Sequence, residues 1–268
     1  MSSADPLPTS VLVVSAVYNN AATVGELHRR LEAATHRAGL EARFLYVDDG
    51  SLDDSWSIIR RLAAAHRTVA GIRLAGNFGQ TRALCAGLES ARADVVVYID
   101  ADLEVPPEAV ELLAPEIFAG HDFVGGARSP RDRHAVRRAG ARAFNALTRI
   151  LTGLDVQDVG CGLVAMGPNV VDAVIDAMRN RPVQIIKPTM MFAATNPIEV
   201  RIPSVSPQNS SHTKRMLIRF AIEFLTLEAT VSASERAGRR EGSTGRASRS
   251  ARIVHAAMRA VAAAVPPV

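Results

Sequence analysis

Short apolar runs rich in β-branched residues alternate with segments of helical spacing, and this alternation limits the fold more than any other feature. The apolar runs cover residues 11–17, 44–47, 69–74, 95–99 and 122–124. Between them, apolar residues recur at helical spacing at 22–38, from Asp53 or Asp54 onward, at 81–91 and at 106–119. Strands and helices that alternate in this way predict an α/β fold, with a doubly wound, mostly parallel sheet flanked by helices.

The pattern loosens after residue 130. We expect a long helix at 134–152, a Gly-rich stretch at 153–167, a helix at 169–178, a strand at 200–205 and an apolar helix at 214–231. The predicted organisation is a single domain over residues 10–231, ending in a C-terminal helix and preceded by a flexible N-terminus at 1–9. Residues 232–268 are basic and low in complexity, which predicts a disordered tail whose last part could form a short helix.

The formal charge of +4 is a property of this tail. Residues 232–268 hold seven arginines and two glutamates, a balance of +5, so +4 minus +5 leaves −1 for residues 1–231. Aromatic residues make up only 4% of the chain, which leaves few platforms for stacking bases, and we expect no nucleic-acid partner. The basic tail and the apolar helix could hold the protein on an anionic membrane surface, although core or dimer packing explains the helix equally well.

The termini and the cysteines bear on the compartment. The N-terminal segment has neither the positive region nor the apolar stretch of a secretion signal. No apolar run reaches the roughly 18–20 residues that a membrane span needs. Cys85 and Cys161 are too few for a disulfide framework or a zinc site of their own, and buried thiols are expected. These features predict a cytoplasmic protein, soluble or peripheral at the inner face of the membrane.

Acidic residues follow two of the predicted strands. Asp48 and Asp49 come after the run at 44–47, and Asp100 and Asp102 come after the fully apolar run at 95–99. Ligands of open α/β sheets bind beyond the carboxyl ends of the strands, so these acids are expected at one edge of the sheet.

Asp100 and Asp102 are separated by one residue, so their side chains are expected to point the same way. A divalent cation between them and a diphosphate would relieve their repulsion and neutralise a departing nucleotide. Acidic pairs after strands also cap helices or lie in solvent, and that alternative stays open.

Two further segments could contact a nucleotide. A carboxylate of the Asp48-Asp49-Gly50-Ser51 segment could accept a hydrogen bond from a nucleobase, although an Asp-Gly pair is also typical of a plain turn. Tyr18, at the end of the first predicted strand, could lie against a base.

Three segments carry a family resemblance, namely VLVVSAVYNN, VDDGSLDDS and NFGQTRALCAGLESARADVVVYIDADLEVPPE. In this order they resemble the family 2 glycosyltransferases of GT-A fold. The branch most similar is that of the polyprenyl-phosphate glycosyltransferases, which includes dolichyl-phosphate mannose synthases and bacterial undecaprenyl-phosphate aminoarabinose transferases. The segments VGGAR at 124–128 and VQDVGCGLVAMGPNVVDAV at 156–174 extend the resemblance. It implies a metal-dependent, inverting enzyme that takes a sugar from a UDP- or GDP-sugar donor.

The resemblance also implies roles for individual residues. Mg²⁺ or Mn²⁺ would be held by Asp102 and Glu104. Arg128 would contact phosphate or sugar, and Asp158 would act as a base or orient the acceptor, so that the catalytic residues would be Asp102, Arg128 and Asp158. The donor would be bound by Tyr18, Asp48, Asp49, Asp100, Ala101 and Lys214.

Some positions depart from that branch. Glu104 stands where the branch usually has glutamine, and Val164 and Gln208 stand where it has arginines. An acceptor phosphate needs cations, so the loss of arginines leaves the acceptor open between a polyprenyl phosphate and the hydroxyl of a small molecule. A non-catalytic relic that only binds a sugar nucleotide is the third hypothesis.

Overall fold

The computed structural model describes residues 10–129, 142, 145, 146, 148–150, 153–180 and 186–203. The chain divides into two compact units, one made of residues 1–141 and 156–207, the other of residues 142–155 and 208–268. The second unit lies mostly outside the described residues, as do the predicted apolar helix at 214–231, the basic tail and Lys214. In the part of the chain that is described, none of the helices combines the length and apolar character that crossing a bilayer requires.

A seven-stranded sheet with the order β3-β2-β1-β4-β6-β5-β7 organises the first unit. Four of its six pairings are parallel, and only β6 runs against its neighbours β4 and β5. The strands are β1 Ser10–Val17, β2 Glu41–Asp48, β3 Val69–Arg73, β4 Val95–Ile99, β5 Phe123–Arg128, β6 Leu163–Met166 and β7 Pro197–Ile202. The predicted mostly parallel α/β sheet is therefore confirmed.

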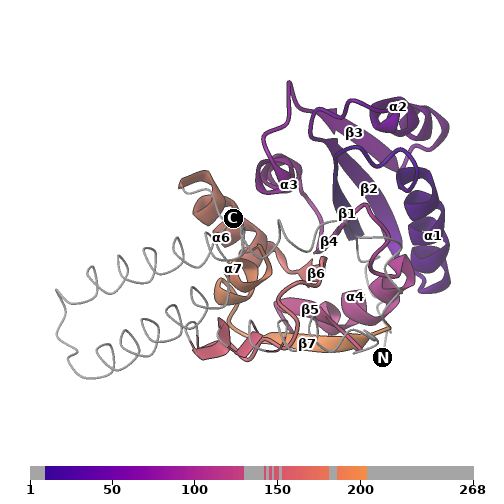
Figure 1. The fold of residues 1–268 in the computed structure, drawn as a ribbon. Coiled ribbons are helices and arrows are strands. Elements are labelled where there is room, and N and C mark those ends of the chain that lie inside the picture. The colour runs from indigo at the N-terminus through magenta and orange to yellow at the C-terminus, as the bar shows by residue number, and fades with distance from the viewer. Residues whose placement is uncertain are drawn as a thin grey trace. The chain divides into compact units, whose positions relative to one another are not determined.

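Helices cover both faces of the sheet (Figure 1). They are α1 Val24–Arg37, α2 Ser55–Ala65, α3 Gln80–Glu89, α4 Val110–Phe118 after a 3-10 turn at Pro107–Ala109, α6 Pro168–Asn180 and α7 Ile186–Phe192. The strand β6 and the helix α7 were not among the predicted elements. β6 is only four residues long and lies between glycines, so its apolar run was too short to stand out from the Gly-rich stretch at 153–167.

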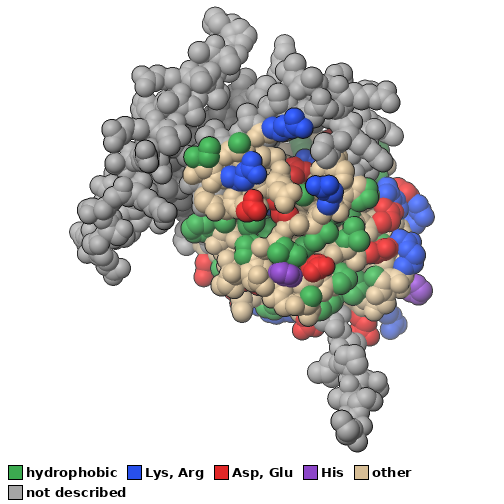
Figure 2. Space-filling view, turned by 90° about the horizontal axis from the view of Figure 1, so that it is seen from below, with side chains coloured by type: hydrophobic (Ala, Val, Ile, Leu, Met, Phe, Trp, Pro, Cys, Tyr) green, Lys and Arg blue, Asp and Glu red, His purple; other side chains and the backbone are tan. Residues whose placement is uncertain are grey.

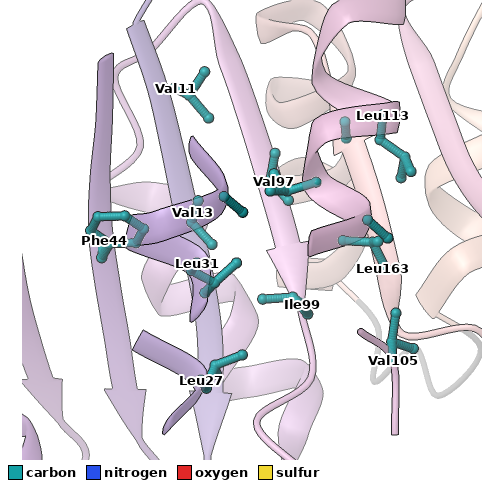
Figure 3. Close-up of a cluster of buried hydrophobic side chains, with 14 of the residues drawn as sticks. Val11, Val13, Leu27, Leu31, Phe44, Val97, Ile99, Val105, Leu113 and Leu163 are labelled. Carbon is teal, nitrogen blue, oxygen red and sulfur yellow. The ribbon is translucent and has the colours of Figure 1, made fainter. Parts of the chain in front are cut away.

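Successive side chains along a strand point to opposite faces of the sheet. Val11 and Val13 lie on the face that packs against Leu27 and Leu31 of α1 and, farther along the sheet, Leu113 of α4 (Figure 3). On the opposite face the backbone of α3 comes close to β1, because a Cβ added to Gly87 would meet Val14 at 2.6 Å. Burial on both faces explains why the central strands are continuously apolar rather than alternating.

Candidate active site

The direction of the strands brings the predicted acids to one edge. β1, β2, β3, β4, β5 and β7 all run the same way, because β6 is antiparallel to both β4 and β5. Asp48 ends β2, Asp100 follows β4 and Arg128 ends β5. The carboxyl ends of these strands therefore meet at the edge where open α/β sheets bind ligands.

Asp100 is the most constrained of these side chains. Its Oδ1 accepts hydrogen bonds from the Tyr98 hydroxyl at 2.5 Å and from Gln80 Nε2 at 2.6 Å. A Cβ added to Gly162 would lie 1.7 Å from Asp100 Oδ2, so any other residue there would displace the Asp100 carboxylate. Burial, and after it the charge of Asp102, raise the pKa of Asp100 to about 7, against the hydrogen bond from Tyr98.

The segment after Asp100 turns sharply. Ala101 is buried, and its carbonyl oxygen accepts a hydrogen bond from Thr23 Oγ1 at 2.6 Å. Leu103 adopts a positive φ of 62°, which is unusual for a residue with a side chain. This turn exposes Asp102 and Glu104, and Asp102 Oδ1 accepts from the Glu104 backbone N–H at 2.9 Å. The charges of Asp102 and Glu104 both act on Asp100, so the three acids form one electrostatic cluster.

Arg128 and Asp158 form an ion pair beside this cluster. Arg128 Nε donates to Asp158 Oδ2 at 2.7 Å, a second guanidinium nitrogen donates to Oδ1 at 3.1 Å, and the Arg128 backbone N–H also donates to Oδ2. Burial works to raise the pKa of Asp158, but hydrogen bonds from Arg128 and its charge hold that pKa below its ordinary value. Asp158 is therefore an ionised carboxylate with both oxygens occupied.

A buried pair that the sequence did not single out holds Asp158 in place. Lys187 Nζ donates to the backbone oxygens of Gly126 at 2.7 Å and Asp158 at 2.8 Å, and it forms an ion pair with Glu199. Both side chains are nearly inaccessible, at 3% and 1% exposure. Glu199 in turn accepts from the backbone N–H of Gln157. Elements far apart in sequence thus fix the loop that carries Asp158.

Asp48 and Asp49 are buried, and they shape the site rather than face it. Asp49 accepts from the backbone N–H groups of Phe78 and Gly79, each at 2.8 Å. Asp48 lies 3.2 Å from Arg73 Nε. With only 0% and 2% of these residues exposed, their predicted contact with the donor would need the surrounding loops to open. The Asp49 carboxylate instead holds the loop at 74–79, and the Asp48 carboxylate accepts from the Ser51 backbone N–H, as buried hydrogen-bonding groups do.

The loop after Asp49 and the loop at 74–77 line an open pocket of about 600 Å³. Its lining residues are Tyr18, Gly50, Ser51, Leu52, Arg73, Leu74, Ala75, Gly76 and Asn77. Tyr18, which the sequence predicted to lie against a base, is among these lining residues. Asn19 and Asn20 tie the loop after β1 to the next loop, because Asn19 Oδ1 accepts from the Leu52 N–H at 2.9 Å and the Asn20 N–H donates to Ser55 Oγ at 2.8 Å.

The acids that follow β4 have the chemistry of a site for Mg²⁺ or Mn²⁺. Both cations prefer oxygen ligands. Burial is the main cause of the raised pKa of Asp100, and the charges of Asp102 and Glu104, which raise it further, are charges that a cation would compensate. Asp102 and Glu104 are exposed and can turn toward a ligand. Asp100, Asp102 and Glu104 do not bring three ligand atoms within 4.8 Å of one another, so the donor's phosphates would have to complete the site.

Several residues of the site lacked a predicted role. Gln80 belongs to the NFGQ segment that carries the family resemblance, and Tyr98 is the one polar-tipped residue in the strand VVVYI. Gly162 sits in the resembling segment as well. Lys187 and Glu199 lie outside the segments that carry the resemblance. The one feature that could have pointed to Lys187 is the rarity of lysine, which occurs only at 187 and 214.

The sequence is similar to those of known glycosyltransferases. Residues 12–166 match the model of the family described as "Glycosyl transferase family 2". An undecaprenyl-phosphate 4-deoxy-4-formamido-L-arabinose transferase of Shewanella sediminis is 34% identical over 221 residues, which cover 82% of this chain and 67% of that protein. The protein of the same name from Pseudomonas aeruginosa is 39% identical over 180 residues, 66% of this chain and 52% of that one. The chain thus spans between about half and two thirds of the length of these relatives.

Solved structures show the same fold. Glucosyl-3-phosphoglycerate synthase from Mycobacterium tuberculosis, in complex with Mn²⁺ and UDP-glucose, is 17% identical with a TM-score of 0.59, over 82% of this chain and 78% of that one. Mannosyl-3-phosphoglycerate synthase from Rubrobacter xylanophilus is 20% identical with a TM-score of 0.57, over 89% and 78%. The predicted GT-A fold and the predicted resemblance are confirmed. The chain belongs to glycosyltransferase family 2.

Proposed function

We propose that this chain transfers a sugar from a nucleotide-diphosphate donor to a polyprenyl phosphate, with inversion at the anomeric carbon. The observation that carries the proposal is the meeting of Asp100, Asp102, Glu104 and the Arg128–Asp158 pair at the carboxyl edge of a family 2 fold. The names of the relatives support this class of acceptor.

The donor would lie across the carboxyl ends of β1, β2 and β4. Its base would enter the pocket beside Tyr18, whose walls Asp48 and Asp49 hold in shape. Asp102 and Glu104 would hold Mg²⁺ or Mn²⁺, which supplies positive charge against the leaving diphosphate. Asp100, bonded to Tyr98 and Gln80, would orient the ribose or the sugar. The Mycobacterium tuberculosis enzyme of the same fold forms a complex with Mn²⁺ and UDP-glucose, which supports this class of cation and donor.

The state of Asp158 favours a phosphate acceptor over a hydroxyl. A hydroxyl needs a general base whose pKa lies near the working pH, but Asp158 has a lowered pKa and both of its oxygens are bonded to Arg128. A phosphate monoester is already an anion and needs no base. In the reaction, an acceptor oxygen forms a bond to the anomeric carbon, while the bond from that carbon to the diphosphate oxygen breaks and the diphosphate leaves with the electron pair. Arg128 and Asp158 would position the acceptor.

A small-molecule hydroxyl remains the second candidate because of one observation. Val164, at a position where the branch usually has arginine, is 1% exposed within β6 and offers no charge to an acceptor phosphate. The two acceptors differ in what they require of Asp158. Removing a general base lowers kcat by about 10²–10⁴-fold, whereas a residue that only positions an anion acts mainly on the acceptor KM.

The test is a transfer assay with radiolabelled UDP- and GDP-sugars, Mn²⁺, and either undecaprenyl phosphate or water-soluble acceptors. We expect lipid-extractable product from the wild type. Asp102→Asn should lower turnover at least about 100-fold, and Asp172→Asn, an exposed acid on α6, should leave it unchanged. Product on water-soluble acceptors alone, with Asp158→Asn acting on kcat, would favour the second candidate. Nucleotide binding without turnover on any acceptor would favour the non-catalytic relic.

A further inference from the structure

We propose that His28, Glu32 and His66 form a second metal site, for a cation of the zinc type, between α1 and α2. His28 and Glu32 lie one turn apart on α1, and His66 is the residue that caps the C-terminus of α2. Each of the three side chains offers one ligand atom, and these three atoms all lie within 4.8 Å of one another. Among the described residues, no other group of three His, Cys, Asp or Glu side chains comes this close together. It lies beside β2, which β1 separates from the strand that precedes Asp100 and Asp102.

His28 supplies the observation that points to a ligand. It is 2% exposed, and its Nδ1 lies 3.1 Å from the Tyr46 hydroxyl. Its Nε2 is buried and has no hydrogen-bond partner among the described residues. A hydrogen bond from one imidazole N–H fixes the tautomer of a metal-ligating histidine and frees the lone pair of the other nitrogen, and the contact of Nδ1 with Tyr46 allows His28 to adopt this tautomer.

Glu32 and His66 provide the two movable ligands. His66 Nδ1 lies 3.2 Å from Glu32 Oε1, and the side chains are 36% and 46% exposed. The His28 and His66 rings are in edge contact, with centroids 5.0 Å apart. Neighbouring ligand atoms in a tetrahedral zinc centre are about 3.4 Å apart, as metal–ligand distances of 2.0–2.1 Å require. The Glu32–His66 distance already meets this value, and the rest of the set closes by rotation of two half-exposed side chains.

The donor set selects the cation. Two neutral imidazoles and one carboxylate suit zinc-type ions, whereas Mg²⁺ and Ca²⁺ prefer sites made wholly of oxygen. Three protein ligands leave a fourth position for water, which the exposure of Glu32 and His66 allows. A cation held here would link α1 to α2 across the surface and stabilise the folded state by its binding.

The experiment measures Zn²⁺ binding to the full chain by titration calorimetry in saturating Mg²⁺, which occupies the oxygen-ligand site at Asp102 and Glu104. Co²⁺ serves as a second probe, through the visible absorption of its tetrahedral complexes. We expect the wild type to bind one Zn²⁺ more than His66→Ala and Glu32→Gln, and these variants to lack the Co²⁺ band. Their altered side chains are half exposed, so both should fold.

His36→Ala is the matched control, since His36 is an exposed histidine on the same helix α1. It should keep the wild-type stoichiometry and spectrum. Zn²⁺ at 100 times its Kd should also raise Tm by about 5 °C or more in the wild type and in His36→Ala, but not in His66→Ala. Equal stoichiometry in the wild type and His66→Ala, or absence of Zn²⁺ binding from the wild type, would overturn the proposal. Neither result depends on the transferase activity.

Discussion

Asp100 shows how far a single side chain of this site depends on its neighbours. Tyr98 and Gln80 hold one of its oxygens, and the missing side chain of Gly162 leaves room for the other. The backbone N–H of Asp100 also donates to the Gly162 carbonyl at 3.0 Å. The glycine therefore sets where the Asp100 carboxylate can lie.

Gly162→Ala should displace Asp100 and lower turnover at least about 100-fold, because misplacing a group near the reacting centre by 1 Å can cost that much. The added Cβ would lie 1.7 Å from Asp100 Oδ2. Gly167→Ala is the control, since its Cβ would approach its neighbours only to 3.7 Å. Steady-state transfer rates of the two variants check the prediction, and equal rates would contradict it.

The lowered pKa of Asp158 determines how the free energy of unfolding should change in acid. Its pKa is lowered when the protein is folded, so the stability that its charge contributes is present above the unfolded pKa of about 3.9 and is lost as the pH falls through the folded value. Arg128→Gln should make this acid loss smaller. Urea unfolding at pH 7 and pH 3 measures it, with Arg29→Gln, from the exposed Glu26–Arg29 pair, as control. A wild-type pH dependence in Arg128→Gln would contradict the account.

At the scale of elements, the loop that carries Asp158 is held by α7 and β7. Lys187 of α7 and Glu199 of β7 form a buried ion pair, and both bond to the backbone of this loop. The lysine fits because residue 125 is a glycine, whose added Cβ would lie 2.5 Å from Lys187 Cε. The active-site pair is thereby anchored to the far edge of the sheet.

Lys187→Met should lower the free energy of unfolding by about 3–5 kcal/mol, because it leaves Glu199 charged and buried without its partner. Adding Glu199→Gln should recover part of that loss by removing the charge. The control is Arg37→Met, from the exposed Arg37–Glu111 pair, which should cost less than about 1 kcal/mol. Urea denaturation measures all three variants, and equal losses in Lys187→Met and Arg37→Met would contradict the role given to the buried pair.

The pocket at the ends of the first three strands depends on a close approach of two loops. Gly50 has a φ of 68°, and an added Cβ would lie 2.5 Å from the backbone carbon of Gly76. Gly50→Ala should therefore push the loops apart and weaken nucleotide binding at least about tenfold, the loss expected when 1.4 kcal/mol of binding energy is removed.

Gly39→Ala is the control that separates the strain of a positive φ from the steric clash with a neighbouring loop. Gly39 has a nearly identical φ of 66° but open space around it, so an alanine there carries only the backbone cost of about 1–2 kcal/mol. Nucleotide affinity should stay unchanged in Gly39→Ala and fall in Gly50→Ala. Calorimetric titration with nucleoside diphosphates checks this, and equal affinities would show that the loop contact does not form the pocket.

The sequence predicted the elements whose pattern is local. Continuous apolar runs such as 95–99 have one stable place, the centre of a two-faced sheet, and the acids after them necessarily lie at its carboxyl edge. β6 and α7 could not be predicted in this way, because β6 has four residues and its antiparallel pairing depends on distant partners.

In the site, too, positions that depend on the local sequence were predicted, whereas contacts between residues far apart in the sequence were not. Tyr18 and Asp100 stand at the ends of strands, as the sequence predicted, whereas the position of Arg128 at the end of β5 was not predicted. Asp49 is bonded to the loop at 74–79, and the Lys187–Glu199 pair bonds to the loop that carries Asp158, which lies 29 to 42 residues earlier in the chain. Contacts of this kind have no local signature. The roles of Asp102, Glu104 and Lys214 stay predictions.

At the scale of the whole molecule, charge is spread without a dominant sign over the described part of the face in Figure 2, where acidic and basic side chains lie interspersed with apolar ones. This agrees with a balance of −1 over residues 1–231. The acidic site would repel a nucleotide diphosphate unless a cation accompanied it. Attachment of the tail to an anionic membrane stays a prediction.

Binding of a nucleoside diphosphate with and without Mn²⁺ tests the central claim most directly. Titration calorimetry with UDP and GDP should show that Mn²⁺ tightens binding of the preferred nucleotide at least about tenfold, since the cation removes the repulsion between carboxylates and diphosphate. Mn²⁺ should tighten nucleotide binding to the same extent in Asp172→Asn, but it should not do so in Asp102→Asn. Equal affinities with and without Mn²⁺, or an undiminished gain in Asp102→Asn, would contradict the account.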